Sequence, residues 1–264
     1  MAIRFRYYPG ARTKALTMSY DDGREYDRRL VALFDRYGIR GTFHLNSGFF
    51  DRPGYVTAAE VPTLYRNHEI SCHTEDHPFL ENMPETEALR EILSDRSALE
   101  TRAGYPVRGM SYPFGTYDDR VIRVMRAAGM EYARTVRATH AFRLPDDWMA
   151  WHPTCHHADG LDELLDQFTN PRHGNMTLFY VWGHSYEFND RDNWDLIEGF
   201  CAKVAALEDT WLATNIEIVD YVNALRGLRV SADGRVVMNP SCLDVWIEAD
   251  GVPVRVASGE TLRL

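Results

Sequence analysis

The chain has 264 residues and a formal net charge of −10, from 29 Lys and Arg against 39 Asp and Glu. Its 45% hydrophobic and 26% charged residues are typical of a soluble globular protein and exclude a disordered chain. Nucleic acid and anionic membrane surfaces would repel so acidic a chain, so we expect neither as a partner.

The first residues are charged and lack the apolar core of a signal peptide, and no run approaches the roughly 18–20 apolar residues that a membrane span needs. The four cysteines are widely spaced, with no Cys-x-x-Cys pair. This spacing indicates reduced thiols rather than a disulfide framework or a zinc ribbon. We therefore expect a cytoplasmic protein.

Short apolar strands alternate with amphipathic helices through most of the chain. The expected strands cover residues 14–20, 41–45, 69–73, 108–112, 131–136, 176–182 and 211–213, and the expected helices cover 26–37, 84–102, 118–128, 195–207 and 216–225. Such alternation predicts parallel strands joined by crossover helices, and hence an α/β sheet or barrel.

The pattern changes near residue 226 to short β segments around two Asp-Gly turns, Asp233-Gly234 and Asp250-Gly251. Asp-Gly between alternating segments is a strong hairpin signal. We expect a main domain over residues 1–226 and a small antiparallel β appendage over residues 227–264 that covers one end of it.

Ionisable residues follow several of the predicted strands, where the catalytic residues of α/β folds gather. Asp21 and Asp22 end the first strand, within an Asp-Asp-Gly sequence that is also common in turns. His73 and His77 follow another strand, four residues apart, which lets two imidazoles face one metal ion. A pair of solvated loop histidines is the alternative.

Together, Asp22, His73 and His77 form a set of two imidazoles and one carboxylate with open positions for water and substrate, as in a catalytic metal site. Asp21 then lies beside the ion, where a carboxylate can take a proton from a metal-bound water. His184 ends the apolar segment over 176–182 and can donate a proton to a leaving group. A packed structural histidine is the alternative for His184.

These residues resemble the motifs of the metal-dependent polysaccharide deacetylases, carbohydrate esterase family 4, also called the NodB homology domain. Residues 19–23 are similar to the first motif, usually Thr-Phe-Asp-Asp-Gly, and residues 73–77 match the second, His-(Ser/Thr)-x-x-His. Residues 112–115, 147–148 and 178–184 resemble the third, fourth and fifth motifs. The order is that of the family, and the matches extend from residue 15 to about residue 190.

The resemblance implies a distorted (β/α)7-type barrel. It also implies that Asp21 is the catalytic base, that His184 is the acid, and that a divalent metal is held by Asp22, His73 and His77. Zn²⁺ is the expected metal, with Co²⁺, Ni²⁺ or Mn²⁺ as alternatives.

Residues beside the motifs are candidates for substrate binding. The resemblance implies that a backbone N–H near Phe114 holds the oxyanion. Aromatic side chains near strand ends can stack on sugars, although they are also ordinary core residues. The candidate substrate-binding residues are Tyr112, Pro113, Phe114, Trp148, Trp182 and His156. For His156 and its neighbour His157, a second metal site is an alternative.

Two positions depart from the family pattern. Ser111 stands where the family has an Arg that steadies the catalytic Asp, and Arg108, three residues earlier, is a candidate substitute. Loss of the family Arg would shift the pKa of Asp21, since a nearby cation favours the charged form of a carboxyl group. Leu144 stands where the fourth motif has its first Asp, which leaves open which carboxylate orients His184.

We expect removal of an N-acyl group, foremost N-acetyl, from an amino sugar or short oligosaccharide. One alternative is a hydrolase of another C–N bond, in a small N-acyl or cyclic amide compound. The other is a carbohydrate-binding relative without catalysis. The expected partner is a small carbohydrate or N-acyl substrate, and the sequence leaves the oligomeric state open.

Overall fold

The computed structural model describes residues 2–170 and 176–264. A sheet of eight strands forms its centre, in the order β6-β5-β4-β3-β2-β8-β7, with β9 also paired to β2. The strands are β2 (Lys14–Asp21), β3 (Thr42–Leu45), β4 (Glu69–Cys72), β5 (Gly109–Ser111), β6 (Tyr132–Arg134), β7 (Cys155–His156), β8 (Thr177–His184) and β9 (Thr210–Leu212). Their pairings are parallel, as the alternation of elements predicts.

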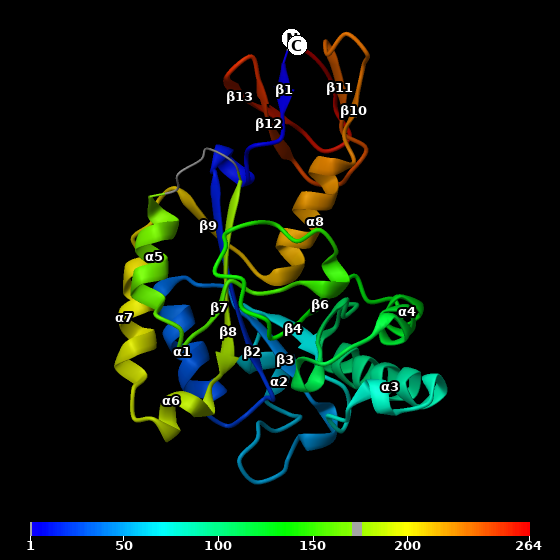
Figure 1. Cartoon of the computed structure of the whole chain (residues 1–264), viewed down its shortest axis with the longest axis vertical. Helices are drawn as coiled ribbons and strands as arrows, with labels where there is room; N and C mark the ends of the chain where they lie inside the picture. The colour runs from blue at the N-terminus through cyan, green and yellow to red at the C-terminus, as the bar shows by residue number, and fades with distance from the viewer. Residues whose placement is uncertain (1, 171–175) are drawn as a thin grey trace.

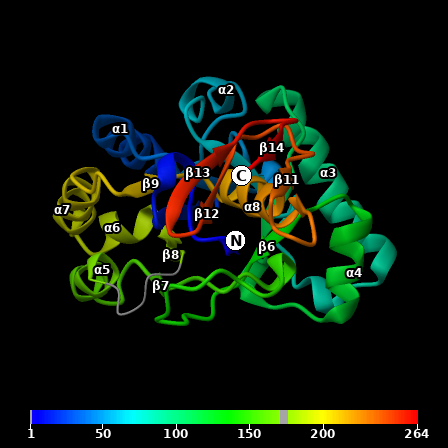
Figure 2. The same cartoon turned by 90° about the horizontal axis from the view of Figure 1, so that it is seen from above.

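The sheet curls into a distorted (β/α) barrel, which confirms the expected fold class (Figures 1 and 2). The N–H of Trp151 donates to the carbonyl of Ala133, and the N–H of Thr135 donates to the carbonyl of Trp151, each over 3.0 Å. These bonds connect the β6 edge with the segment that leads into β7, so the two edges of the sheet approach each other there.

Helices surround the sheet. They are α1 (Asp27–Tyr37), α2 (Val61–Leu64), α3 (Glu85–Ala103), α4 (Asp119–Ala127), α5 (Leu161–Thr169), α6 (Tyr186–Asp190), α7 (Trp194–Ala205) and α8 (Asn215–Arg226). Gly38 ends α1 in the left-handed region, with φ 65°. Thr214 and Glu217 form a capping box that begins α8. The sequence predicted five of these helices, whereas α2, α5 and α6 were not predicted.

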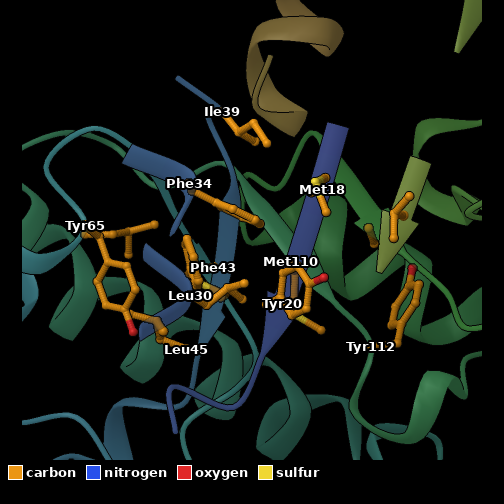
Figure 3. Close-up of a cluster of buried hydrophobic side chains, with 14 of the residues drawn as sticks. Met18, Tyr20, Leu30, Phe34, Ile39, Phe43, Leu45, Tyr65, Met110 and Tyr112 are labelled. Atoms are coloured by element: carbon orange, nitrogen blue, oxygen red, sulfur yellow. The ribbon is translucent and has the colours of Figure 1, made fainter. Parts of the chain in front are cut away.

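Strand β2 is buried on both faces, and its two faces differ in chemistry. Met18 and Tyr20 face the helices and pack with Phe34 and Phe43 in the main hydrophobic core (Figure 3). On the other face, Thr17, Ser19 and Asp21 are polar and buried. Because side chains alternate along a strand, the packing of the core face fixes the direction in which Asp21 points.

The antiparallel segment consists of two three-stranded sheets, β1-β12-β13 and β10-β11-β14. Its strands are β1 (Ile3–Arg4), β10 (Arg229–Val230), β11 (Val236–Met238), β12 (Val245–Ala249), β13 (Val252–Val256) and β14 (Thr261–Arg263). Both Asp-Gly turns connect hairpins, as predicted. The pairing of Ile3 with Ala249 was not predicted, and it brings the first residues of the chain into this segment.

The antiparallel segment lies at the end of the barrel where the strands begin, beyond α8, and the carboxyl ends of the strands point the other way (Figure 1). The N–H groups of Asn215 and Ile216 at the start of α8 donate to Thr42 and Glu69, at the amino ends of β3 and β4. The four cysteines are free thiols. In the described part of the chain, no helix combines the length and the apolar character needed to cross a lipid bilayer.

Candidate active site

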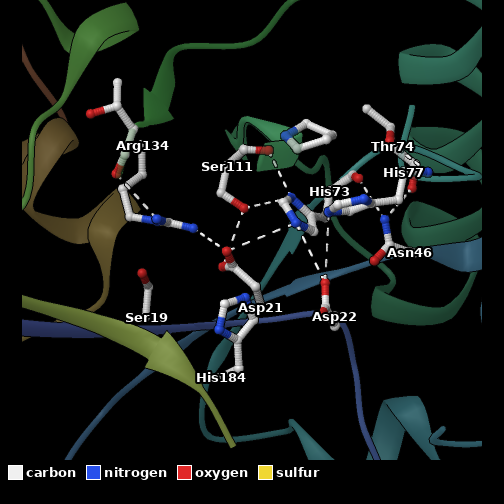
Figure 4. A network of polar contacts seen from close by, with 12 residues as sticks. Ser19, Asp21, Asp22, Asn46, His73, Thr74, His77, Ser111, Arg134 and His184 are labelled. Carbon is white, nitrogen blue, oxygen red and sulfur yellow. Dashed lines mark hydrogen bonds and ion pairs between the residues drawn. The ribbon is translucent and has the colours of Figure 1, made fainter. Parts of the chain in front are cut away.

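Asp22, His73 and His77 come together at the carboxyl ends of β2 and β4 (Figure 4). The Oδ1 atom of Asp22 lies 3.6 Å from Nε2 of His73 and 3.9 Å from Nε2 of His77. One ligand atom from each residue lies within 4.8 Å of the others. Two imidazole nitrogens and one carboxylate oxygen fit Zn²⁺ and similar divalent ions, and three protein ligands leave positions for water and substrate.

Backbone conformations that side chains rarely adopt are concentrated at this site. Asp22, Thr74, His77 and Phe114 have φ values of 79°, 66°, 55° and 58°. Such conformations cost about 1–3 kcal/mol each and persist where the surrounding contacts hold them. Here the side-chain amide of Asn46 donates to the carbonyl of Thr74 over 2.9 Å, and the N–H of His77 donates to the Thr74 hydroxyl over 3.1 Å. The turn that aims His77 is therefore fixed by its own hydrogen bonds.

His73 is oriented by the strand beside it. Its Nδ1 lies 2.8 Å from the carbonyl oxygen of Ser111, which can only accept a hydrogen bond. The proton therefore lies on Nδ1, and the lone pair of Nε2 faces Asp22. The backbone N–H of His73 donates to Asp95 over 3.0 Å. The ring is thus held in the tautomer that a metal ligand needs.

Asp21 lies beside this set and is almost completely buried, with 2% of its surface exposed. Its carboxylate pairs with the guanidinium of Arg134 and accepts a 3.2 Å hydrogen bond from the Ser111 hydroxyl. Burial alone would raise the pKa of Asp21, but Arg134 and His73 outweigh it and hold that pKa well below its usual range. Asp21 is therefore ionised at neutral pH.

Arg134 is the residue at this site that the sequence analysis missed. It ends β6, is fully buried, and its guanidinium carbon lies 4.2 Å from the centre of the Trp182 ring. Arg108 does not substitute for the missing Arg, because it pairs with Asp220 over 2.6 Å and with Glu131 over 3.1 Å. The cation beside Asp21 thus comes from the strand that follows Ser111. A basic residue inside the predicted strand over residues 131–136 was the available signal.

His184 lies next to Asp21, since the two residues are register partners in β8 and β2 (Figure 4). The carboxylate of Glu187 lies 3.6 Å from its Nδ1. The other oxygen of Glu187 lies 2.9 Å from Nε2 of both His156 and His157. Leu144 packs against the hydrophobic cluster that includes Ile218 and Val222 of α8, so it takes no part in this arrangement.

The candidate substrate-binding residues occupy very different places. The Phe114 ring is 49% exposed, stacks on Phe79 with ring centres 3.8 Å apart, and meets His77 edge-on. This exposed pair forms a rim next to a candidate metal ligand. Phe79 was not predicted, and its loop position gave no periodic signal.

The other candidates do not face the site in the way that the sequence suggested. Tyr112 is 1% exposed, and its hydroxyl donates to the carbonyl of Met149, so it is a core residue, as is the buried Pro113. The indole of Trp148 donates to Asn223 on α8. Trp182 packs under Arg134, and His156 bonds to Glu187. The last two therefore contact other site residues and leave Phe114 as the exposed member of the set.

Comparison with known proteins gives this arrangement a family. The sequence model of the polysaccharide deacetylases matches residues 9–133, which include Asp21, Asp22, His73 and His77. Residues 9–133 belong to the polysaccharide deacetylase family. The chain is 27% identical over 124 residues to a peptidoglycan-N-acetylglucosamine deacetylase of Listeria monocytogenes serotype 1/2a, a match that covers 46% of this chain and 26% of that protein. The chain thus spans about a quarter of the length of the curated relatives it matches.

Solved structures share the fold of this chain at low sequence identity. A candidate polysaccharide deacetylase from Mycobacterium smegmatis superimposes with a TM-score of 0.63 at 18% identity, over 83% of this chain and 93% of that one. A protein of Bacillus anthracis described as a carbohydrate esterase family 4 pseudoenzyme superimposes with a TM-score of 0.53 at 15% identity, over 81% of this chain and 68% of that one. At these identities the likeness concerns the fold alone.

Proposed function

We propose that this protein is a metal-dependent hydrolase that removes an N-acyl group, foremost an N-acetyl group, from an amino sugar or a short oligosaccharide. The observation that carries the proposal is the convergence of Asp22, His73 and His77 beside the buried pair of Asp21 and Arg134. The family of residues 9–133 supports a carbohydrate substrate.

Asp22, His73 and His77 would hold a divalent cation, foremost Zn²⁺, with Co²⁺, Ni²⁺ and Mn²⁺ as alternatives for the same ligand types. Such a cation, when bound, supplies a Lewis acid and lowers the pKa of a coordinated water. The protein's part is to keep the ligand set in place, through the Nδ1 contact of His73 and the strained turn before His77.

Asp21 serves as the general base. Its low pKa keeps it ionised, and Arg134 and Ser111 fix the orientation of its carboxylate. It takes a proton from the water as the water oxygen attacks the acyl carbon. The base is therefore held rigidly before the substrate arrives, which favours reaction through correct orientation.

Phe114 and His184 complete the reaction. Phe114 is the second residue of a short 3-10 helix, where the first N–H groups have no partner within the helix. Its N–H stabilises the negative charge that develops on the acyl oxygen. His184 gives a proton to the amine nitrogen as the C–N bond breaks, so the products are a free amine and a carboxylate.

The test is acetate release from N-acetylated oligosaccharides by the purified chain with Zn²⁺ or Co²⁺, with and without a chelator. We expect metal-dependent turnover that Asp21→Asn reduces by about 10²–10⁴-fold, the usual contribution of a general base. Asp190→Asn, which alters an exposed carboxylate on α6, is the matched control and should turn over as the parent does.

Three results would contradict this proposal. The first is an Asp21→Asn protein as active as the parent. The second is hydrolysis of small N-acyl or cyclic amides in the same assay with no release from any acetylated sugar, which would assign the site to a different C–N bond. The third is binding of sugars without turnover under every metal, which would place the chain among non-catalytic relatives.

A further inference from the structure

One carboxylate beside the proposed acid is surrounded by imidazoles. His156 and His157 come from the end of β7, His184 from the end of β8, and Glu187 from α6. These elements lie next to one another at the end of the barrel opposite the antiparallel segment (Figure 1). None of the steps described above uses His156, His157 or Glu187.

The two oxygens of Glu187 face different partners. Oε2 lies 2.9 Å from Nε2 of His156 and 2.9 Å from Nε2 of His157. Oε1 lies 3.6 Å from Nδ1 of His184 and 3.9 Å from the guanidinium of Arg191. The carboxylate is therefore flanked on one side by two imidazole nitrogens and presents its other oxygen to His184.

His157 is itself fixed by packing. It is 1% exposed and stacks between Tyr20 and Phe188, with ring centres 5.8 and 4.2 Å away. A side chain at Gly183 would collide with its ring, so β8 passes directly against it. Burial lowers the pKa of His157 to about 4, so the ring is neutral and donates a single N–H. The anchor of Glu187 is thus rigid.

The distances favour direct contacts between the two imidazoles and the carboxylate over a second metal ion. An ion bound by His156, His157 and Glu187 would lie about 2.0–2.2 Å from each ligand atom, which in tetrahedral geometry separates neighbouring ligand atoms by roughly 3.3 Å. The two observed separations of 2.9 Å are ordinary N–H···O lengths. The guanidinium of Arg191 next to Glu187 also disfavours a further cation.

We propose that His156, His157 and Glu187 form a positioning array for His184, in which Glu187 holds the Nδ1 side of the ring and leaves Nε2 for proton transfer. The proposal rests on the acid role of His184 in the proposed function. Glu187, three residues after His184, would provide the carboxylate that the fourth family motif has at the position of Leu144. The 3.6 Å separation is of a kind that shortens when substrate binds.

The charges around His184 agree with this role. Burial lowers the pKa of His184, but Glu187 on α6 and Asp21 and Asp22 at the end of β2 raise it, and the net change is upward. His157, directly after β7, is a neutral ring close to it. A raised pKa keeps an acid protonated at neutral pH, and loss of the Glu187 charge would lower that pKa.

The first test is Glu187→Gln, which keeps the shape of the side chain and removes its charge. We expect kcat to fall by about 10–100-fold with KM nearly unchanged, within the range that general acid catalysis contributes. The alkaline limb of the pH–rate profile should move to lower pH by about one pH unit, because the acid loses its proton earlier. Asp190→Asn, on the same helix, should change neither quantity.

A second pair of variants keeps the test valid if Glu187→Gln does not fold. His156→Ala removes one donor to Glu187, whereas His156→Gln retains an N–H at nearly the same reach. We expect the alanine variant to lose activity and the glutamine variant to recover most of it. Equal activity in both variants would overturn the positioning role.

Two further measurements separate this inference from the proposed function. NMR titration of the His184 ring follows its pKa without any substrate, and Glu187→Gln should lower it even in a protein that shows no turnover. An unchanged titration would overturn the array while leaving the hydrolase intact. A second bound Zn²⁺ in the parent that His156→Ala loses would make the cluster a metal site and also overturn the array.

Discussion

At the scale of single residues, the buried ion pair of Asp21 and Arg134 decides how the site works. Asp21 is 2% exposed and Arg134 is fully buried, so neither charge is compensated by water. Removing one partner of such a pair leaves an unpaired buried charge and costs about 3–5 kcal/mol. The pair therefore couples the stability of the barrel to the ionisation of the proposed base.

Arg134→Gln tests this coupling. Without the guanidinium, burial dominates and the pKa of Asp21 rises. A general base must be ionised, so the acid limb of the pH–rate profile should move to higher pH and activity at neutral pH should fall. Arg134→Lys should keep part of the activity, since it retains the charge but not the flat contact with Trp182. An acid limb in Arg134→Gln at the parent's pH would contradict the assignment.

The sequence could name the candidate ligands but not the residues that support them, for a physical reason. Asp21, Asp22, His73 and His77 lie in two short motifs whose spacing is itself a chemical signal. Arg134 lies on β6, four places from β2 in the sheet order, and only the closed barrel brings it to Asp21. The same reason applies to Trp182. Its place near His184 in the sequence suggested a ring that stacks on a sugar, whereas in the structure the ring packs against the guanidinium of Arg134.

At the scale of elements, Glu69 joins β4 to the start of α8. Its carboxylate accepts hydrogen bonds from the N–H of Ile216 and the hydroxyl of Thr42, each over 2.9 Å, and from the hydroxyl of Tyr132 over 2.7 Å. Burial raises the pKa of Glu69 to about 7 despite these bonds. The folded protein therefore binds a proton here that the unfolded chain, with an ordinary Glu pKa, has already lost.

Glu69→Gln tests this with a neutral side chain of the same shape. In the parent, the contribution of Glu69 to stability is complete below the unfolded pKa and declines as pH rises through about 7. The variant lacks this decline, so its free energy of unfolding relative to the parent should improve between pH 5 and pH 8, by at most about 2–3 kcal/mol. Chemical denaturation at both pH values measures it. The same difference at both values would show that Glu69 is charged in the fold.

Helices and strands were predicted correctly where the hydrophobic pattern extends over many residues. They were missed where the element is short or where a strand pairs with a segment far away in the sequence. Residues 178–182 are apolar throughout and form the centre of β8, where all but Trp182 are buried. Helix α6 has five residues, too few for a periodic pattern. Helix α5 did carry the spacing, with Leu161, Leu164, Leu165 and Phe168 buried, so its signal was present in the sequence.

At the scale of the whole molecule, the proposed metal site should be coupled to thermal stability. A cation that binds only the folded chain stabilises it by mass action, by about 2.7 kcal/mol at one hundred times its Kd. We expect Zn²⁺ to raise the Tm of the parent and a chelator to reverse the change. Asp22→Asn should bind more weakly and respond less. An equal rise in both proteins would place the bound ion elsewhere on the chain.

The antiparallel segment should likewise stabilise the barrel, although it lies at the end opposite the candidate active site. Strand β1 at the start of the chain pairs with β12 near its end. The hydroxyl of Tyr221 on α8 donates to the carbonyl of Tyr7 over 2.8 Å and accepts from the N–H of Trp246 over 3.0 Å. Val245 and Ile247 are completely buried in the same cluster as α8. Removal of this segment would therefore expose apolar surface on the barrel itself.

A chain that ends at residue 226 tests this directly. Each large apolar side chain that loses its cover costs about 1.5–3 kcal/mol, and several such losses reach the total stability of an ordinary domain. We expect the shortened chain to unfold at a much lower temperature or to aggregate. Tyr221→Phe, which removes only the two hydrogen bonds, should cost about 1–3 kcal/mol and leave Zn²⁺ binding unchanged, because α8 contacts the amino ends of the strands. A shortened chain with the Tm of the parent would mean that residues 1–226 form an independent domain and that the antiparallel segment is an accessory to it.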